Sequence, residues 1–283
     1  MKVFITRDAA EFAAHTGAFL LSRPIEHNVL ATVVARLDPA DCTDAPVFGW
    51  VEAGRSGAVS GAALRTPPRR LLASSMGAET ADVLMAGLLE ADPELPGVNG
   101  PQPAASYLAQ AWRRLAGGTV EPAMSQAIYW LSRVDEPPRR PPGRSRPAEH
   151  SDRDLMIEWT LAFSQEAGLP AVNVESSIDR RLGDDGLFVW DHDGAASMVG
   201  ISAPVTGVVR LGPVYTPPAA RRHGYATALV AEVSRCALAS GATKCMLYTD
   251  LANPTSNSIY QTVGYRRSSD AHEYHFSHNL QRG

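Results

Sequence analysis

The stretch "YTPPAARRHGYATALV", residues 215–230, decides the fold of the second half of the chain. A β-favouring segment ends at Pro217-Pro218, two arginines and a glycine follow, and an alanine-rich apolar run then starts a helix. The first N–H groups of a helix lack an intrahelical acceptor, and the helix dipole adds partial positive charge there. Gly224 lets a ligand approach the backbone closely, and arginines bond anions strongly. The segment predicts a phosphate-binding helix N-terminus, with a plain positive surface loop as the alternative.

A second segment, "NPTSNSIYQTVGY", follows the strand-like "KCMLYTD" at residues 244–250. Asn253 is suited to cap a helix, Pro254 to its first position, and Gly264 to its end. Around the two segments, the hydrophobic periodicity predicts a mixed α/β domain. Its expected order is helix 151–163, helix 176–182, a hairpin over 186–202 turning at Asp193-Gly194, strand 208–216, helix from 225, strand 244–250, helix 254–263 and strand 272–278.

Taken together, the two segments resemble the GNAT superfamily of acyl-CoA-dependent N-acyltransferases. In that family an Arg-x-x-Gly-x-Gly/Ala loop, matched here by Arg221 to Ala226, cradles the coenzyme A pyrophosphate. A later Asn…Tyr…Gly-Phe/Tyr stretch matches Asn253, Tyr260 and Gly264-Tyr265. The resemblance covers roughly residues 140 to 283. It implies an α/β fold with a mixed central sheet flanked by helices.

The resemblance also implies roles for individual residues. The pantetheine arm would lie in a gap between the strand ending at 214–216 and the strand 244–250, where backbone groups polarise the thioester carbonyl. Tyr260 would be the general acid that protonates the departing thiolate; a core aromatic is the alternative. The expected cofactor-binding residues are Val214, Tyr215, Thr216, Arg221, Arg222, His223, Gly224, Tyr225, Ala226, Thr227 and Asn253.

One departure from the family pattern concerns the general base. Many members carry a glutamate on the strand before the phosphate loop, whereas "VVRLGPVYT" offers no carboxylate and places Arg210 there. Glu175, Asp250 or a water molecule are candidates, and the sequence does not choose among them. The base is therefore left unassigned.

The first half of the chain shows a parallel order of helices and strands: helix 9–20, strands 48–54 and 58–68, helix 79–90, helix 103–115 and strand 127–134. Its middle helix, however, begins near Glu79 and Asp82, whose charges would repel a pyrophosphate at that helix end. Aligning Pro103 with Pro254 puts Ala109 where Tyr260 stands. We predict a degenerate GNAT-like domain over residues 1–137, in tandem with a catalytic domain over 138–283. An unrelated α/β substrate-binding or dimerisation domain is the alternative. The Pro- and Arg-rich segment 135–147 is expected to be an exposed linker.

Composition narrows the function further. The chain has 283 residues and a net charge of −4, which argues against general binding to nucleic acid or to anionic membranes. Its opening residues interrupt any signal-peptide core with charges, so a cytoplasmic protein is expected. No metal site is expected, because odd spacings on a strand point histidines 272, 275 and 278 to opposite faces. The cysteines lack metal-ligand or disulfide patterns; they are Cys42, Cys236 and Cys245.

These expectations combine into one functional hypothesis. The chain would transfer an acetyl group from acetyl-CoA to a primary amine of a small molecule, as a monomer or homodimer. A protein N-terminal or lysine acetyltransferase is the alternative within enzymes. A non-catalytic acyl-CoA-binding sensor is the alternative outside them: Tyr260 argues against it, and the missing strand carboxylate argues mildly for it.

Overall fold

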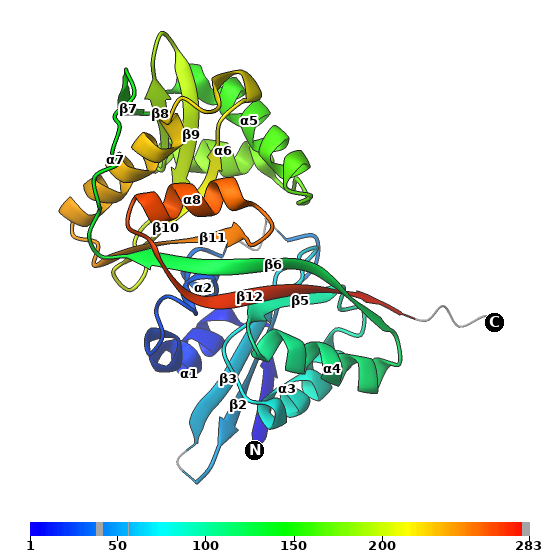
Figure 1. Cartoon of the computed structure of the whole chain (residues 1–283). Coiled ribbons are helices and arrows are strands. Elements are labelled where there is room, and N and C mark those ends of the chain that lie inside the picture. Colours follow the sequence, from blue (N-terminus) through cyan, green and yellow to red (C-terminus); the bar gives the residue numbers. More distant parts are fainter. Residues whose placement is uncertain (38–41, 56, 279–283) are drawn as a thin grey trace. The chain divides into compact units, whose positions relative to one another are not determined.

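The computed structural model describes residues 1–37, 42–55 and 57–278, and it divides into two compact units (Figure 1). The first unit contains residues 1–128, 250–252 and 269–283, and the second contains 129–249 and 253–268. Strands β6 (Thr119–Leu131) and β12 (Arg266–Ser277) each contribute residues to both units. Each unit is therefore built from more than one stretch of the chain. The sequence suggested a single division after residue 137.

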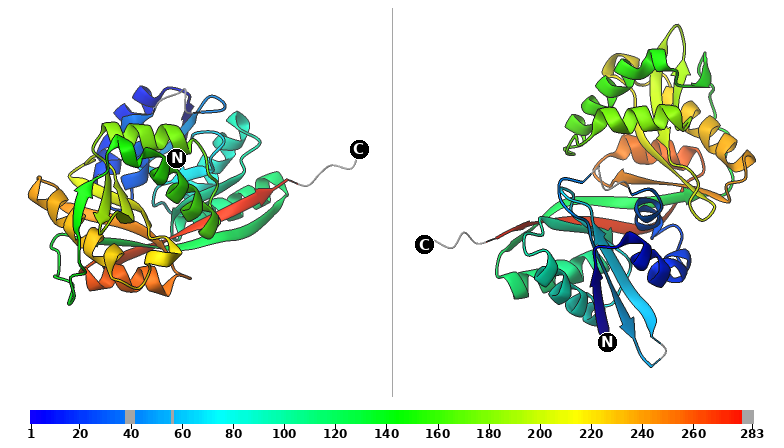
Figure 2. Two further views of the ribbon diagram at one scale, coloured as in Figure 1. Left: turned by 90° about the horizontal axis from the view of Figure 1, so that it is seen from above. Right: turned by 180° about the vertical axis from the view of Figure 1, so that it is seen from behind.

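The first unit is a sheet between two pairs of helices. Its strands lie in the order β1-β2-β3-β4-β5-β12, and residues 271–275 of β12 pair antiparallel with β5. Side chains alternate along β2: Phe48 and Trp50 pack against α1 and α2, while Val47 and Val51 pack against α3 and α4. Both sets of views show these helix pairs on opposite faces (Figures 1 and 2). The bounds are β1 Lys2–Thr6, α1 Ala9–Leu21, α2 Asn28–Arg36, β2 Val47–Ala53, β3 Ala58–Arg65, β4 Leu71–Ala73, α3 Ala78–Ala91, β5 Gly97–Pro101 and α4 Ala104–Ala116.

The second unit has strands in the order β11-β10-β9-β8-β7, antiparallel except for the parallel pair β10 and β11. Apolar side chains of α5 and α6 cluster with Val189, Met198 and Tyr215 of the strands. Helix α7 lies on the other face of these strands (Figure 1). The bounds are β7 Arg144–Pro147, α5 Arg153–Glu166, α6 Val174–Gly183, β8 Leu187–Asp191, β9 Ala195–Ile201, β10 Val208–Tyr215, α7 Tyr225–Ala239, β11 Lys244–Asp250 and α8 Pro254–Thr262.

The segment 135–147 is mostly exposed, as its composition suggested. It lies wholly within the second unit, and its last four residues form strand β7. Two further contacts attach it: the Asp135 N–H donates to the Val263 carbonyl at 2.9 Å, and the Trp190 indole donates to the Pro142 carbonyl at 2.9 Å. The prolines of this segment cannot extend a helix, but they do not prevent an edge strand.

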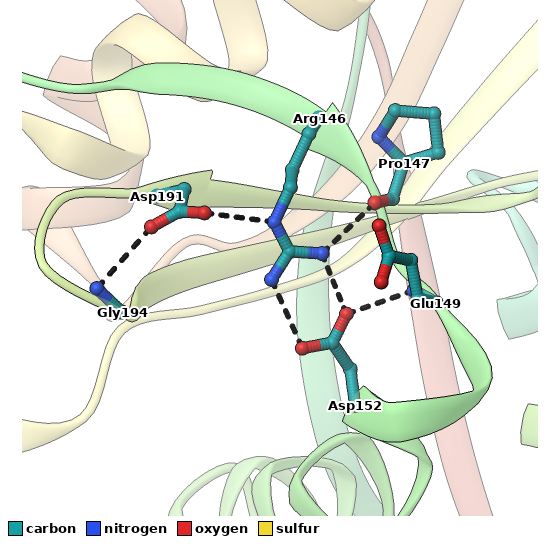
Figure 3. Close-up of polar contacts among 6 residues, drawn as sticks. All are labelled: Arg146, Pro147, Glu149, Asp152, Asp191 and Gly194. Atoms are coloured by element: carbon teal, nitrogen blue, oxygen red, sulfur yellow. Dashed lines mark hydrogen bonds and ion pairs between the residues drawn. The ribbon is translucent and has the colours of Figure 1, made fainter.

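Arg146 connects this edge strand to the start of α5 (Figure 3). Its guanidinium donates to both carboxylate oxygens of Asp152, at 2.6 and 3.0 Å, and to Asp191 at 2.9 Å. Hydrogen bonds and charge from Arg146 hold the pKa of Asp152 and of Asp191 below their usual range. Asp152 also accepts from the Glu149 N–H, which closes the turn before the helix.

Candidate active site

The two parallel strands β10 and β11 pair near their amino ends, at Val208–Arg210 against Lys244–Met246. Among the described residues, their register does not continue toward the carboxyl ends. On the other edge of β10, the register with β9 shifts between Leu211 and Val214, where the chain passes Gly212 and Pro213. Pro213 has no N–H to donate to a ladder, and this bulge re-aims the end of the strand. Residues 214–216, which are expected to face a pantetheine arm, thus come after the last paired position between the two strands, Arg210 with Met246.

Helix α7 follows this strand end after the loop 216–224, which contains a short 3-10 turn at Pro218–Ala220. Gly224 is its N-cap, with φ of 85°, and Arg222 also has a positive φ of 67°. A Cβ at Gly224 would meet only Pro141, at 4.0 Å, so a ligand could reach the backbone there. The first turn carries no acidic residue, unlike that of α3, where Glu79 stands. The amide groups and dipole of α7 are therefore free of a compensating carboxylate on the same turn and suit a phosphate group.

Tyr260 lies on α8 in a buried position. Its side chain is 7% exposed, and burial raises its pKa to about 12. Its ring meets that of Tyr265 edge-on at 6.1 Å, and helices α7 and α8 pack together. Burial is the sole cause of the raised pKa, and no side-chain hydrogen bond from the described residues contributes to it. A phenol with this pKa stays protonated at neutral pH, as a general acid must.

Comparison with known proteins agrees with this geometry. Residues 148–265 match the model of the "Acetyltransferase (GNAT) family". The chain carries a GNAT acetyltransferase domain. No curated protein shows a significant sequence match.

Solved structures extend the likeness to the whole chain. A GNAT acetyltransferase from Colwellia psychrerythraea is 11% identical with a TM-score of 0.60, covering 99% of this chain and all of the other. A GCN5-related N-acetyltransferase from Sphaerobacter thermophilus is 15% identical with a TM-score of 0.62, covering 96% and 94%. A tandem GNAT protein from the clavulanic acid biosynthesis pathway is 15% identical with a TM-score of 0.55, covering 98% of both chains. The predicted mixed α/β GNAT-like fold in tandem is thereby confirmed. The family transfers acyl groups from acyl-CoA.

All predicted site residues lie in the second unit, but their surroundings differ. In the loop of the GNAT domain, Arg222, His223 and Gly224 are exposed, and the His223 ring stacks on Tyr225 at 5.4 Å. Ala226 and Thr227 lie half-buried in the first turn of α7. The predicted N-cap role of Asn253 is confirmed, because its side chain accepts from the Ser256 N–H at 3.0 Å.

The end of β10 is more occupied than the sequence indicated. Val214 is half-buried, while Tyr215 is buried, and its carbonyl accepts a hydrogen bond from the Ser197 hydroxyl at 3.0 Å. The Thr216 carbonyl accepts from Nε of Arg221 at 2.9 Å. Two backbone acceptors expected to face the cofactor arm are thus already bonded within the protein. Ser197 could not be identified from the sequence, since it is one polar residue in an apolar strand.

Arg221 itself is engaged by a residue that the sequence analysis did not consider. Its Nη2 lies 2.8 Å from each carboxylate oxygen of Glu166, the last residue of α5. The hydroxyl of Tyr215 donates to the same carboxylate at 3.2 Å. Burial and the Glu166 charge raise the pKa of Tyr215. No local sequence signal links a helix end to a loop 55 positions away, so this contact had to come from the structure.

The contacts of the two candidate bases, Glu175 and Asp250, are those of surface and turn residues. Glu175 is largely exposed and lies 3.8 Å from Arg153. Asp250 accepts from the Ala252 N–H at 2.8 Å, as a turn residue does, and falls in the first unit. On β10, the guanidinium of Arg210 occupies the position where many family members have glutamate, and burial lowers its pKa.

The described part of the chain also bears on metal binding, membrane spans and disulfides. None of its His, Cys, Asp and Glu side chains form a group of three or more able to hold a metal ion. None of its helices is long and apolar enough to cross a membrane. The three cysteines form no disulfide.

Proposed function

We propose that the second unit is an N-acetyltransferase that moves the acetyl group of acetyl-CoA to a primary amine of a small molecule. The observation that carries the proposal is the combination of strands β10 and β11, which pair near their amino ends, with the N-terminus of α7, which has no acidic residue in its first turn. Gly224 supports the fit to a diphosphate, because nothing within 4 Å except the rim of Pro141 would touch a side chain there.

In this proposal the residues from Arg221 to Thr227 hold the pyrophosphate. Backbone N–H groups of the first turn of α7 supply the hydrogen bonds, and the exposed guanidinium of Arg222 adds charge. Residues 214–216 lie beside the pantetheine arm. Their N–H groups are the donors and the Val214 carbonyl is the acceptor, because the carbonyls of Tyr215 and Thr216 are already bonded. Asn253 keeps its amide nitrogen for the arm, while its oxygen caps α8.

Tyr260 acts as the general acid in the proposed reaction. The neutral acceptor amine attacks the thioester carbonyl, and the adduct gives up its extra N–H proton to water. The C–S bond then breaks, and the phenol donates its proton to the leaving sulfur. Burial raises the pKa of the phenol, so the phenol stays protonated. No side-chain acceptor among the described residues contributes to this pKa. Solvent then returns the proton to the phenolate after the products leave.

Two other functions are the alternatives to a small-molecule acetyltransferase. A protein N-terminus or lysine would also satisfy the chemistry, and it needs an open groove where a small amine needs a closed pocket. The acyl-CoA sensor remains the candidate from another class, and Arg210 at the usual glutamate position favours it. We also propose that the protein acts in the cytoplasm, has one coenzyme A site per chain, and is a monomer or a homodimer.

Thiol release from acetyl-CoA in the presence of a panel of small amines tests the proposed function. If the protein is the proposed enzyme, thiol release rises with the concentration of one or a few amines. A catalytically inactive protein shows no such release. A protein that binds coenzyme A but releases no thiol with small amines, peptides or lysine-rich protein is a sensor. Binding and release with peptides alone would replace the small acceptor by a protein substrate.

A further inference from the structure

The contact between Arg221 and Glu166 places a carboxylate on the arginine of the phosphate loop. Both Glu166 oxygens lie 2.8 Å from one guanidinium nitrogen, and the two side chains are 48% and 42% exposed for Glu166 and Arg221. The contact joins the end of α5 to the loop before α7, two parts of the same unit. The charge of Arg221 is thus already compensated inside the protein.

Two contacts besides Glu166 also orient that guanidinium. Nε of Arg221 donates to the Thr216 carbonyl at 2.9 Å, and the guanidinium lies over the Tyr215 ring at 5.8 Å. Both contacts favour a position of the group against the end of β10. What Glu166 adds is negative charge and an oxygen pair on the nitrogen that a phosphate oxygen would use.

Carboxylate and diphosphate compete for the same donor. A phosphate oxygen on Nη2 would fall within contact distance of the Glu166 oxygens, and one on Nη1 would still lie beside a like charge. We propose that Glu166 is an internal competitor for the diphosphate of coenzyme A at Arg221, and that cofactor binding must displace it. Displacement of Glu166 would also release the Tyr215 hydroxyl, which donates a hydrogen bond to the same carboxylate.

This inference rests on the proposed function, since it concerns the affinity of that same cofactor site. It makes Glu166 a residue that sets affinity: the wild-type protein binds coenzyme A less tightly than its loop alone would allow. Ligands without a diphosphate, such as pantetheine, gain nothing from displacing Glu166.

The test is calorimetric titration of the full chain with coenzyme A. Glu166→Gln keeps the shape of the side chain and removes its charge, so it should tighten binding about threefold to tenfold, the range expected when a partly exposed ion pair no longer has to be broken. The matched control is Glu158→Gln, which removes the same charge from an exposed position about two turns earlier on α5 and should leave affinity unchanged.

Further arms separate this inference from its alternatives. Because competition acts through Arg221, adding Glu166→Gln to Arg221→Ala should change affinity much less than it does in the wild type. Equal tightening by Glu158→Gln would show a general charge effect and overturn the inference. Unchanged binding by Glu166→Gln would show that Glu166 does not compete, and weaker binding would show that it positions Arg221; either result would overturn the inference. Wild-type protein that binds no coenzyme A would remove the proposed function, and the inference with it.

Discussion

Replacing Tyr260 by phenylalanine separates its chemical role from its packing role. The substitution removes one oxygen that has no side-chain partner among the described residues, while the ring keeps its contact with Tyr265. No buried partner is left unpaired, so the free energy of unfolding should change by less than about 0.5 kcal/mol. If the phenol protonates the leaving thiolate, kcat should fall about 10²- to 10⁴-fold, with the affinity for acetyl-CoA nearly unchanged.

Tyr265 provides the matched control, because it lies 6.1 Å away but has a bonded hydroxyl. Its oxygen is 2.8 Å from that of Ser234, which is completely buried. Tyr265→Phe leaves the Ser234 hydroxyl without this partner and should cost about 1–3 kcal/mol of folding stability. Its kcat should stay near wild type.

Thiol release at saturating acetyl-CoA and acceptor measures kcat for the two variants, and denaturant unfolding measures their stability. The two tyrosines should thus show opposite patterns: activity lost without stability at 260, and stability lost without activity at 265. Tyr260→Phe activity within about a factor of two of wild type would refute the acid assignment, since that change is far below the general-acid range. An equal loss of kcat in both variants would show that the effect comes from packing of α8.

Four other outcomes are expected. Arg146→Ala should lower the free energy of unfolding by about 2–4 kcal/mol in denaturant titration, between exposed and buried ion pairs. Gly224→Ala should cost about 1–2 kcal/mol in the same assay, because its φ of 85° disfavours a Cβ. Thiol release should show no loss from Tyr260 deprotonation below about pH 11, since its pKa is about 12. Burial lowers the pKa of His27, so the unfolded state binds the proton first and stability falls below pH 6.5; His27→Gln should flatten that pH dependence.

The local sequence signals predicted most of the second unit. Asn253 and Pro254 begin α8 as expected, and the Asp193-Gly194 turn joins β8 to β9 with positive φ at both residues. These features depend on near neighbours in the chain, where capping and turn geometry act. The first unit was predicted less completely: β1, α2 and the three-residue β4 were not expected. Their stability comes from pairing and packing with distant residues, which short windows of sequence do not contain.

The site was predicted in its backbone and not in its ion pairs. Glycine, proline and arginine in fixed order indicate a phosphate loop, because each acts on its own local conformation or charge. Glu166 and Ser197 act on the site from α5 and β9, and neither carries a motif. The segment 135–147 is mostly exposed, as its composition suggested, but its contacts with Val263 and Trp190 lie far along the chain and could not be predicted from composition.

The most direct test of the central claim is titration of the full chain with coenzyme A, combined with hydrogen exchange to locate the site. One molecule should bind per chain, and amides between residues 214 and 227 should gain protection, since the strand end and the start of α7 would hold the cofactor. The start of α3, with Glu79 in its first turn, should show none. Two equivalent sites, protection at α3, or no binding at all would contradict the account.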